Sequence, residues 1–354
     1  MELACGRVEL MEEYCHKVMA QKDFSTLESL LVYLVKIHRL TFMEAKHQEA
    51  IDLCLDVLKK LGCRLVANRS QMHGQAIISL LQTVKVAQEK SSASFFRTHR
   101  TLSDPVQEVF ITVLSKPFFA CYFADVKFLT VLLICRKVRI TLEHGVNDFS
   151  GETYGSWAVL VNGIIGDTKT ASSFADMAIL LQQRSKSKYV MTTTICATAC
   201  FTYARTKLLQ SCLLAVQEGF TIGMHSGNIE FALLCLPGYR IQLPYVMGKS
   251  LENVLTRCQA CVDQMEELNQ TEASFDAKIF WEMMLNLAGQ SKETSELKGV
   301  IFDADTYVCD ALIHTAHVHR SRVELLVFYV TLRMLQRLLY RLVTSSKRQP
   351  CHIF

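Results

Sequence analysis

Proline is scarce in this chain, with five prolines in 354 residues. Because proline lacks a backbone N–H and interrupts helices, this scarcity permits long helices and argues against proline-rich linkers. Strict alternation of apolar and polar residues is also rare, so nothing indicates a half-buried β-sheet. No stretch reaches the ~18 uncharged apolar residues that a membrane-spanning helix needs. Since half of the residues are hydrophobic, the chain can still build a large core.

A strong overall charge is missing too, because the formal net charge is +4. A charge this small does not by itself indicate nucleic-acid binding, and we expect no nucleic-acid partner. Residues 1–15 contain acidic side chains where a secretion signal needs an apolar segment, so we expect no such signal. The fourteen cysteines are scattered along the chain, which is typical of reduced thiols in a cytoplasmic protein.

The motifs of common phosphate-transferring and hydrolytic enzymes are also absent. A P-loop requires GxxxxGK[ST], and the nearest string, residues 163–170, separates Lys169 from Gly166 by two residues. The sequence lacks the HRD and DFG motifs of protein kinases and the HExxH motif of zinc proteases. A catalytic set that meets only in space would leave no such motif. We predict a protein without enzymatic activity and without a cofactor.

Apolar residues recur at helical spacing over most of the chain, which predicts an all-α fold. Asp104 followed by Pro105 is typical of a helix start. The clearest predicted helices span residues 44–61, 75–89, 105–115, 120–143, 152–165, 168–184, 188–204, 206–223, 229–236 and 251–268. We predict four segments: N-terminal helical hairpins in residues 1–90, a loop or linker in 91–104, helical repeats in 105–313, and a basic helix with its tail in 314–354.

Two glycine turns organise the middle of the chain. Gly166-Asp167 and Gly227-Asn228 are each followed by an alanine, Ala171 or Ala232, five residues after the glycine. A helix, a glycine turn and a second helix with a small residue at the close contact form a helical hairpin. Such a hairpin cannot bury both of its faces alone and stacks on its neighbours. The pattern therefore predicts an α-solenoid of helix-turn-helix, tetratricopeptide-like hairpins.

Residues around these turns also carry a likeness to a known class of proteins. They are Leu142, Gly145, Ser150, Tyr154, Gly166, Asp167, Phe174, Ala178, Gly219, Gly227, Asn228 and Ala232. Residues 44–300 resemble the tetratricopeptide-like helical region of multi-domain signalling ATPases and of serine/threonine and histidine sensor kinases. The resemblance implies stacked helical pairs and a role in signal transduction. The P-loop ATPase and kinase domains of those proteins are absent from this sequence.

Two groups of side chains have the spacing of metal ligands. Cys258 and Cys261 form a CxxC pair on an apolar helix stripe, and His314 and His317 share one helix face. A zinc site normally needs a second pair at ligand spacing, and here the groups lie ~50 residues apart. The alternative is that the cysteines pack in the core and the histidines are exposed or hydrogen-bonded.

The C-terminal segment carries the basic charge of the chain. Arg333, Arg337 and Arg341 are spaced four apart beside a leucine-rich surface, which indicates a basic amphipathic helix suited to an anionic membrane or an acidic partner. Cys351 stands fourth from the end, and the terminal Phe354 completes a formal match to a prenylation box. The alternative is that this helix caps the solenoid and that the box occurs by chance.

Three functional hypotheses follow. The first is a non-catalytic scaffold that binds a protein or peptide partner in its groove, with Tyr154 and Asn162 as candidate contacts. The second is a peripheral membrane adaptor anchored by the C-terminal helix and a lipid on Cys351. The third is a regulatory fragment of an ATPase or kinase signalling protein.

The membrane hypothesis predicts the distribution of the chain in fractionated cells. Wild-type protein is expected to sediment partly with membranes, and Cys351→Ser to shift to the soluble fraction, because one lipid plus a basic segment supplies the two signals of stable anchoring. Immunoblotting of both fractions measures the shift. An equal, fully soluble distribution of wild type and Cys351→Ser would contradict the hypothesis.

Overall fold

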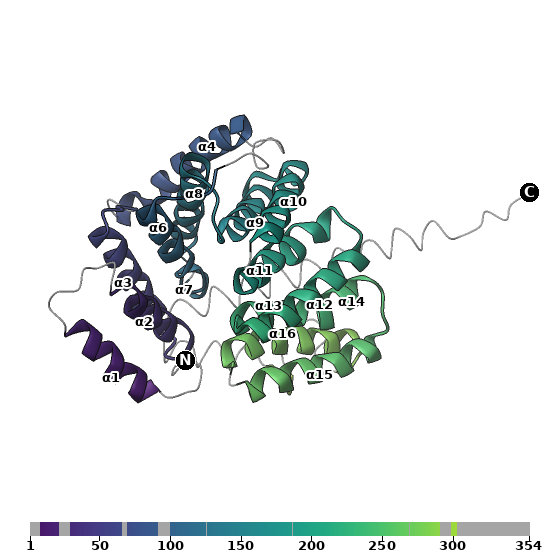
Figure 1. Cartoon of the computed structure of the whole chain (residues 1–354). Coiled ribbons are helices and arrows are strands. Elements are labelled where there is room, and N and C mark those ends of the chain that lie inside the picture. Colours follow the sequence, from purple (N-terminus) through teal and green to yellow (C-terminus); the bar gives the residue numbers. More distant parts are fainter. Residues whose placement is uncertain are drawn as a thin grey trace, which may run out of the picture. The chain divides into compact units, whose positions relative to one another are not determined.

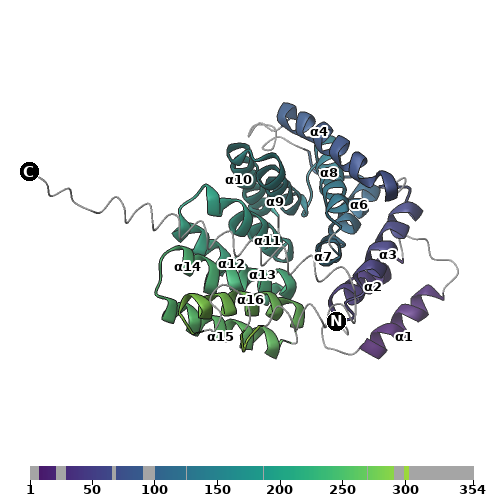
Figure 2. The ribbon, with the colours of Figure 1, turned by 180° about the vertical axis from the view of Figure 1, so that it is seen from behind.

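The fold was analysed in a computed structural model of the chain, which describes residues 8–20, 29–65, 69–90, 100–124, 126–185, 187–268, 270–290 and 299–302. Helices account for most of these residues, and no β-strand occurs among them (Figure 1, Figure 2). The all-α prediction is therefore confirmed. The chain divides into two compact units, Met1–Leu236 and Pro237–Phe354. This division does not coincide with the linker predicted in residues 91–104.

The N-terminal part of the first unit is made of helices. They are α1 (Val8–Met19), α2 (Leu30–Phe42), α3 (His47–Lys60), the short 3-10 helix η2 (Arg69–Gln71) and α4 (Met72–Lys90). Helices α2 and α3 pack against each other, whereas α4 packs on the later helix α8 (Lys127–His144). Pairing here does not follow the order of the chain, because the next helix, α6 (Pro105–Ser115), contacts both α3 and α8.

Helix α6 has the bounds predicted for it, because its start is encoded locally. The Asp104 carboxylate accepts hydrogen bonds from the backbone N–H groups of Val106, at 2.9 Å, and Gln107, at 3.4 Å. Pro105 needs no acceptor at the first helical position. The helix predicted over residues 120–143 is instead divided into α7 (Phe118–Phe123) and α8.

The first unit continues with α-helices interspersed with short π- and 3-10 helices. They are α9 (Ser150–Leu160), the π-helix η3 (Val161–Ile165), α10 (Thr168–Arg184), α11 (Lys188–Ile195), the π-helix η4 (Cys196–Cys200), the 3-10 helix η5 (Tyr203–Arg205), α12 (Leu209–Ser226) and α13 (Ile229–Pro237). Helix α9 packs on α10, and α11 packs on α12. These two pairs start 38 residues apart, at Ser150 and Lys188.

Both predicted glycine turns are present. Gly166 and Gly227 end their helices with φ of 80° and 79°, a left-handed conformation that glycine adopts without steric cost. The Asp167 side chain caps α10 through the backbone N–H of Thr170, at 3.0 Å. Asn228 accepts at 3.4 Å from the N–H of Phe231 and thereby helps to begin α13.

Helix α8 is the centre of the first unit. Its residues Leu129, Leu133 and Ile140 belong to a core cluster formed with α2, α3, α6 and α7. Other α8 residues, among them Val131 and Val138, belong to a second cluster formed with α4, α9 and α10. The helix is thus covered on nearly all sides, which explains why its apolar pattern is not confined to one stripe.

A buried ion pair joins this central helix to its neighbours. The Lys137 ammonium of α8 lies 2.6 Å from the Glu152 carboxylate of α9, and the two side chains are 2% and 6% exposed. Ser115 of α6 and Ser156 of α9 donate to the same carboxylate at 3.0 and 3.2 Å. The charges are therefore paired and hydrogen-bonded, as burial requires.

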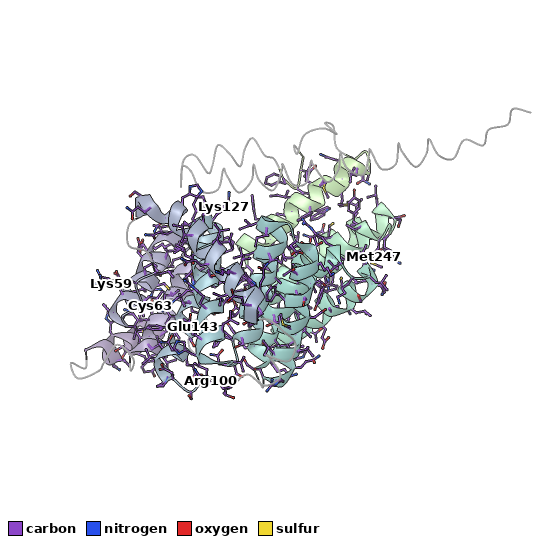
Figure 3. The ribbon with its side chains drawn as sticks, turned by 90° about the horizontal axis from the view of Figure 1, so that it is seen from above. Lys59, Cys63, Arg100, Lys127, Glu143 and Met247 are labelled. Carbon is purple, nitrogen blue, oxygen red and sulfur yellow. The ribbon has the colours of Figure 1, made fainter. Side chains whose placement is uncertain are left out.

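Residues 100–104 are held against the α8–α9 connection. The backbone N–H of Leu102 donates to Val146 at 2.8 Å, and that of Val146 donates to Arg100 at 3.0 Å. The Arg100 guanidinium also donates at 3.0 Å to the backbone oxygen of Glu143 near the end of α8 (Figure 3). This part of the predicted linker is therefore an ordered part of the first unit, and residues 91–99 lie outside the described residues.

The second unit is described from Pro237 to Phe302, apart from its gaps. It contains the π-helix η6 (Gly238–Gln242), α14 (Leu243–Val246), α15 (Leu251–Glu267) and α16 (Thr271–Leu287). Helices α15 and α16 pack together, and η6 contacts α14 and α15. In the described part of both units, no helix combines the length and apolar character required to cross a bilayer.

Removal of Lys137 is expected to destabilise the chain strongly. Lys137→Ala leaves the Glu152 carboxylate buried without its cation, which costs about 3–5 kcal/mol of the free energy of unfolding. Lys207→Ala is the matched control, because the Lys207–Asp176 pair is 41% and 50% exposed and contributes about 0–1 kcal/mol. Urea denaturation followed by circular dichroism measures both. Equal losses in the two variants would show that the buried pair is not critical.

Candidate functional site

A small pocket in the first unit gathers charged and aromatic side chains from five helices and the α6–α7 junction. We call it the inner pocket. Its volume is about 50 Å³. The charged and polar groups that line it are His38 of α2, Ser115 and Lys116 where α6 ends, Glu152 of α9, Tyr189 of α11 and Glu230 of α13.

Aromatic rings form one wall of the inner pocket. The Phe119 ring of α7 lies 5.2 Å from Phe42 of α2 and 4.6 Å from Phe231 of α13, measured between ring centroids. Helix α7 therefore lies between α2 and α13 (Figure 1). Lys116-Pro117 ends α6 and turns the chain so that α7 presents Phe119 in this position. Phe119 is buried, whereas Phe42 and Phe231 keep part of their surface exposed.

The charged side of the pocket contains a histidine–glutamate contact between helices distant in sequence. Nε2 of His38 lies 3.3 Å from Oε1 of Glu230. Burial lowers the pKa of His38, an effect that Lys116 assists and the Glu230 carboxylate opposes. At neutral pH the imidazole is therefore neutral, and its contact with Glu230 is not an ion pair there.

Lys116 is the least satisfied charge of the pocket. Burial lowers the pKa of its ammonium, although the carboxylates of Glu230 and Glu152 oppose this shift. Nζ lies 5.5 Å from the centroid of the Tyr189 ring, which is a cation–π geometry. Within the described residues the ammonium forms neither an ion pair nor a hydrogen bond. Burial, and next the charge of Glu230, raises the pKa of Tyr189 to about 12, so its hydroxyl remains protonated.

These contacts suit recognition better than bond-breaking chemistry. Glu152 is held by Lys137 and two serines, and Glu230 lies against His38. The pocket therefore offers an ammonium that requires an acceptor, next to partly exposed aromatic surface. That combination recognises an apolar side chain beside a carboxylate.

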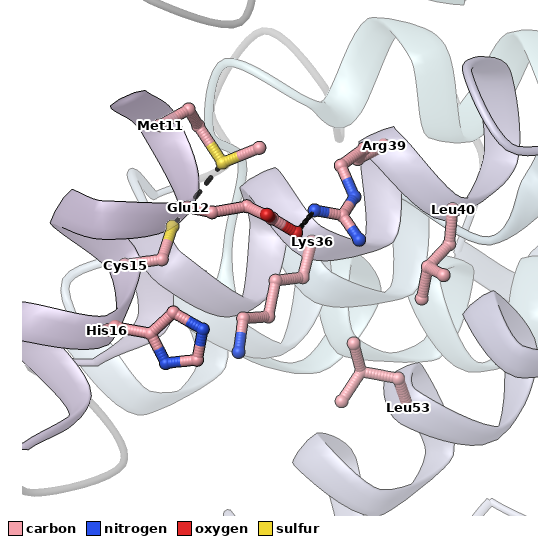
Figure 4. A pocket seen from close by; sticks show the side chains of 8 residues that line it. All are labelled: Met11, Glu12, Cys15, His16, Lys36, Arg39, Leu40 and Leu53. Carbon is pink, nitrogen blue, oxygen red and sulfur yellow. Dashed lines mark hydrogen bonds and ion pairs between the residues drawn. The ribbon is translucent and has the colours of Figure 1, made fainter. Parts of the chain in front are cut away.

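A second cavity, of about 220 Å³, lies between α1 and the helices α2 and α3 (Figure 4). Its wall contains Met11, Cys15 and His16 of α1 and Lys36 and Arg39 of α2. The Arg39 guanidinium is already engaged by Glu12 and Glu44. The Cys15 thiol donates to the Met11 sulfur at 3.5 Å. Most polar groups here are thus satisfied by their neighbours.

The two residues predicted to contact a partner in the groove lie in the interior instead. Tyr154 is 0% exposed, and its ring stacks on Phe174 at 6.1 Å. Asn162 is 4% exposed and donates at 2.9 Å to the backbone oxygen of Phe201. A partner cannot reach either side chain in this structure. Both residues connect neighbouring helices, because helical pairs bury the face on which they stand.

Of the predicted metal ligands, the structure describes Cys258 and Cys261. Cys258 and Cys261 of α15 are both 0% exposed, and burial raises the pKa of each thiol to about 12. No third Cys, His, Asp or Glu ligand joins them among the residues described. The other predicted residues, His314, His317, Arg333, Arg337, Arg341 and Cys351, lie outside the described residues.

No motif in the sequence indicates the inner pocket. His38, Lys116 and Glu230 are widely separated in the chain, and each stands on a helix with an ordinary apolar pattern. The only local signal is Lys116-Pro117, which marks a break between helices without indicating a site. Residues that meet only through helix packing leave no spacing motif.

Comparison of the chain with protein-family models, with curated proteins and with solved structures finds no match. The resemblance to signalling ATPases and sensor kinases therefore stays a prediction, and function has to be argued from the inner pocket itself.

The charge state of His38 predicts how stability depends on pH. Because its pKa is lowered in the folded chain, the unfolded chain binds a proton more readily below about pH 6.5. The free energy of unfolding should then decline as pH falls from about 6.5 toward 5. His38→Gln should flatten this decline, whereas the matched variant His144→Gln, at the exposed end of α8, should keep the wild-type slope. Urea denaturation at several pH values measures the slopes, and equal slopes in all three proteins would contradict the assignment.

Proposed function

We propose that this chain is a non-catalytic scaffold that binds a protein segment through the inner pocket. The observation that carries the proposal is the Lys116 ammonium, which lies beside aromatic rings without an ion pair or hydrogen bond in the described part of the chain. Lys116 is half-buried, so its ammonium is only partly solvated, and a carboxylate of a bound partner would supply a charge-assisted acceptor beside the rings.

The pocket also indicates the chemistry of the partner. A volume of about 50 Å³ takes the end of one side chain and not a whole small-molecule ligand. The partly exposed rings of Phe42, Phe231 and Tyr189 extend the contact surface beyond the pocket. We therefore propose a peptide segment in which an apolar anchor residue packs on these rings and an adjacent carboxylate pairs with Lys116.

The architecture that we propose for this function is an α-solenoid of tetratricopeptide-like hairpins. Its support is the two successive pairs α9–α10 and α11–α12, which start 38 residues apart, and the two glycine turns with buried alanines five residues later. Helical repeats recognise extended segments through shape and a few polar contacts. A relation to the regulatory helical region of signalling ATPases and sensor kinases, and a role in signal transduction, belong to the same proposal.

The peripheral membrane adaptor remains the alternative function. It depends on Arg333, Arg337, Arg341 and Cys351, which lie outside the described residues. A cytoplasmic location, possible for either function, is likewise a proposal. The two functions are compatible, because a chain anchored by its C-terminal segment can present the inner pocket to a partner.

Pocket variants are expected to lose the partner while an aromatic variant elsewhere keeps it. Lys116→Gln removes the cation and Tyr189→Ala the ring, and each should weaken binding by about tenfold or more. Phe201→Ala is the matched control, because Phe201 is 53% exposed and does not line the pocket. Proteins captured by the wild type are identified by quantitative mass spectrometry, and a synthetic peptide from the captured segment is titrated calorimetrically.

The peptide should bind wild type and Phe201→Ala equally, and its own carboxylate→amide version should bind more weakly. Equal affinity for the pocket variants and the control would overturn the proposal. Retained helical circular dichroism in each variant ensures that a loss reflects the pocket and not unfolding.

A further inference from the structure

Three cysteines that do not line the inner pocket converge at one point of the first unit. Cys196 and Cys200 begin and end the π-helix η4, and Cys235 stands on α13. Their three Sγ atoms all lie within 4.8 Å of one another. Cys196 and Cys235 are 1% and 0% exposed, whereas Cys200 is partly exposed.

The backbone of this region is shaped around the three sulfurs. A π-helix is uncommon and is frequently found at functional sites, and here it places both ends of the CATAC segment on one face. Gly219 of α12 faces Ile195 and Cys235. A Cβ atom there would stand 3.3 Å from the Cys235 sulfur and 2.8 Å from Ile195. Because glycine has no side chain, Gly219 leaves space for the Cys235 sulfur and thus for the cluster.

The spacing of the sulfurs fits a metal ion. Metal–sulfur bonds of about 2.3 Å place neighbouring sulfurs about 4 Å apart, so small rotamer changes bring all three thiolates to one ion. In the described part of the chain, no fourth Cys, His, Asp or Glu atom completes the group. Zinc prefers four ligands in a structural site. A set of three soft sulfurs in a dry setting suits monovalent copper, which accepts trigonal thiolate coordination.

The three thiols also hydrogen-bond to one another. Among the cysteines described, Cys200 is the one residue that keeps part of its surface exposed.

We propose that Cys196, Cys200 and Cys235 form a trigonal thiolate site for one monovalent copper ion. Binding exchanges thiol protons for Cu⁺ and releases them to solvent, and the oxidation states of copper and sulfur do not change. Affinity must consequently fall as pH is lowered, because protons compete for the same sulfurs. The ion would join the end of α11 to α13 and so stabilise this part of the fold.

The test is an anaerobic titration of the reduced full-length chain with Cu⁺ in competition with a colorimetric Cu⁺ chelator. Wild type should bind one more Cu⁺ ion tightly than does the triple variant Cys196→Ser/Cys200→Ser/Cys235→Ser. X-ray absorption of the tightly bound ion should show three sulfur neighbours. The single variant Cys200→Ser, at the partly exposed position, keeps the test valid if the triple variant does not fold.

Cys200→Ser is expected to weaken Cu⁺ binding by about 10- to 100-fold or more, the loss that even outer partners of a metal ligand produce. The double variant Cys258→Ser/Cys261→Ser is the matched control, since it removes another buried pair, and it should bind as wild type does. Two results would overturn the proposal. One is equal Cu⁺ affinity of wild type and Cys200→Ser, and the other is tight binding of Zn²⁺, but not of Cu⁺, by the three cysteines.

Discussion

The buried pair of Lys137 and Glu152 is the constraint on which the first unit depends. It joins α8 to α9, and through Ser115 it includes α6. Helix α8 is covered by one core cluster on one side and by a second cluster on the other. Apolar packing alone permits such a helix to rotate or slide between its neighbours. A charge pair with defined hydrogen bonds allows one register, because every other register leaves charges buried and unpaired.

The same network prepares the inner pocket. Ser115 and Glu152 belong both to the ion pair's surroundings and to the lining of the pocket. Since Lys137 neutralises Glu152, that carboxylate is not available as the partner of Lys116, which follows Ser115 directly. The Lys137–Glu152 pair that fixes the helix register thus also leaves the Lys116 ammonium, at the surface of the core, without an acceptor among the described residues. The register of the helices and the proposed recognition of a partner therefore depend on the same ion pair.

Small residues have a comparable role between α12 and α13. Cβ atoms at Gly219 and Gly223 would meet Ile195, Cys235 and Ala232, so glycine at these positions lets the helices approach closely. Asn228 completes the contact by donating to the backbone oxygen of Tyr189 at 2.7 Å. This close approach brings Cys235 to the two cysteines of η4. It also holds α13, and with it Glu230 and Phe231, against α11.

The sequence by itself determined the all-α class, the start of α6 at Asp104, the bounds of α10 and the turns at Gly166 and Gly227. Each of these depends on residues close together in the chain, whose conformational preferences act before any tertiary contact. Only the tertiary structure decided that α4 packs on α8, that Tyr154 and Asn162 are buried, and that His38 meets Glu230. It also decided that Cys196, Cys200 and Cys235 converge, whereas the conspicuous Cys258 and Cys261 acquire no third ligand from the described residues. Such meetings depend on how helices stack, and the spacing of residues along one helix does not encode which other helix will face it.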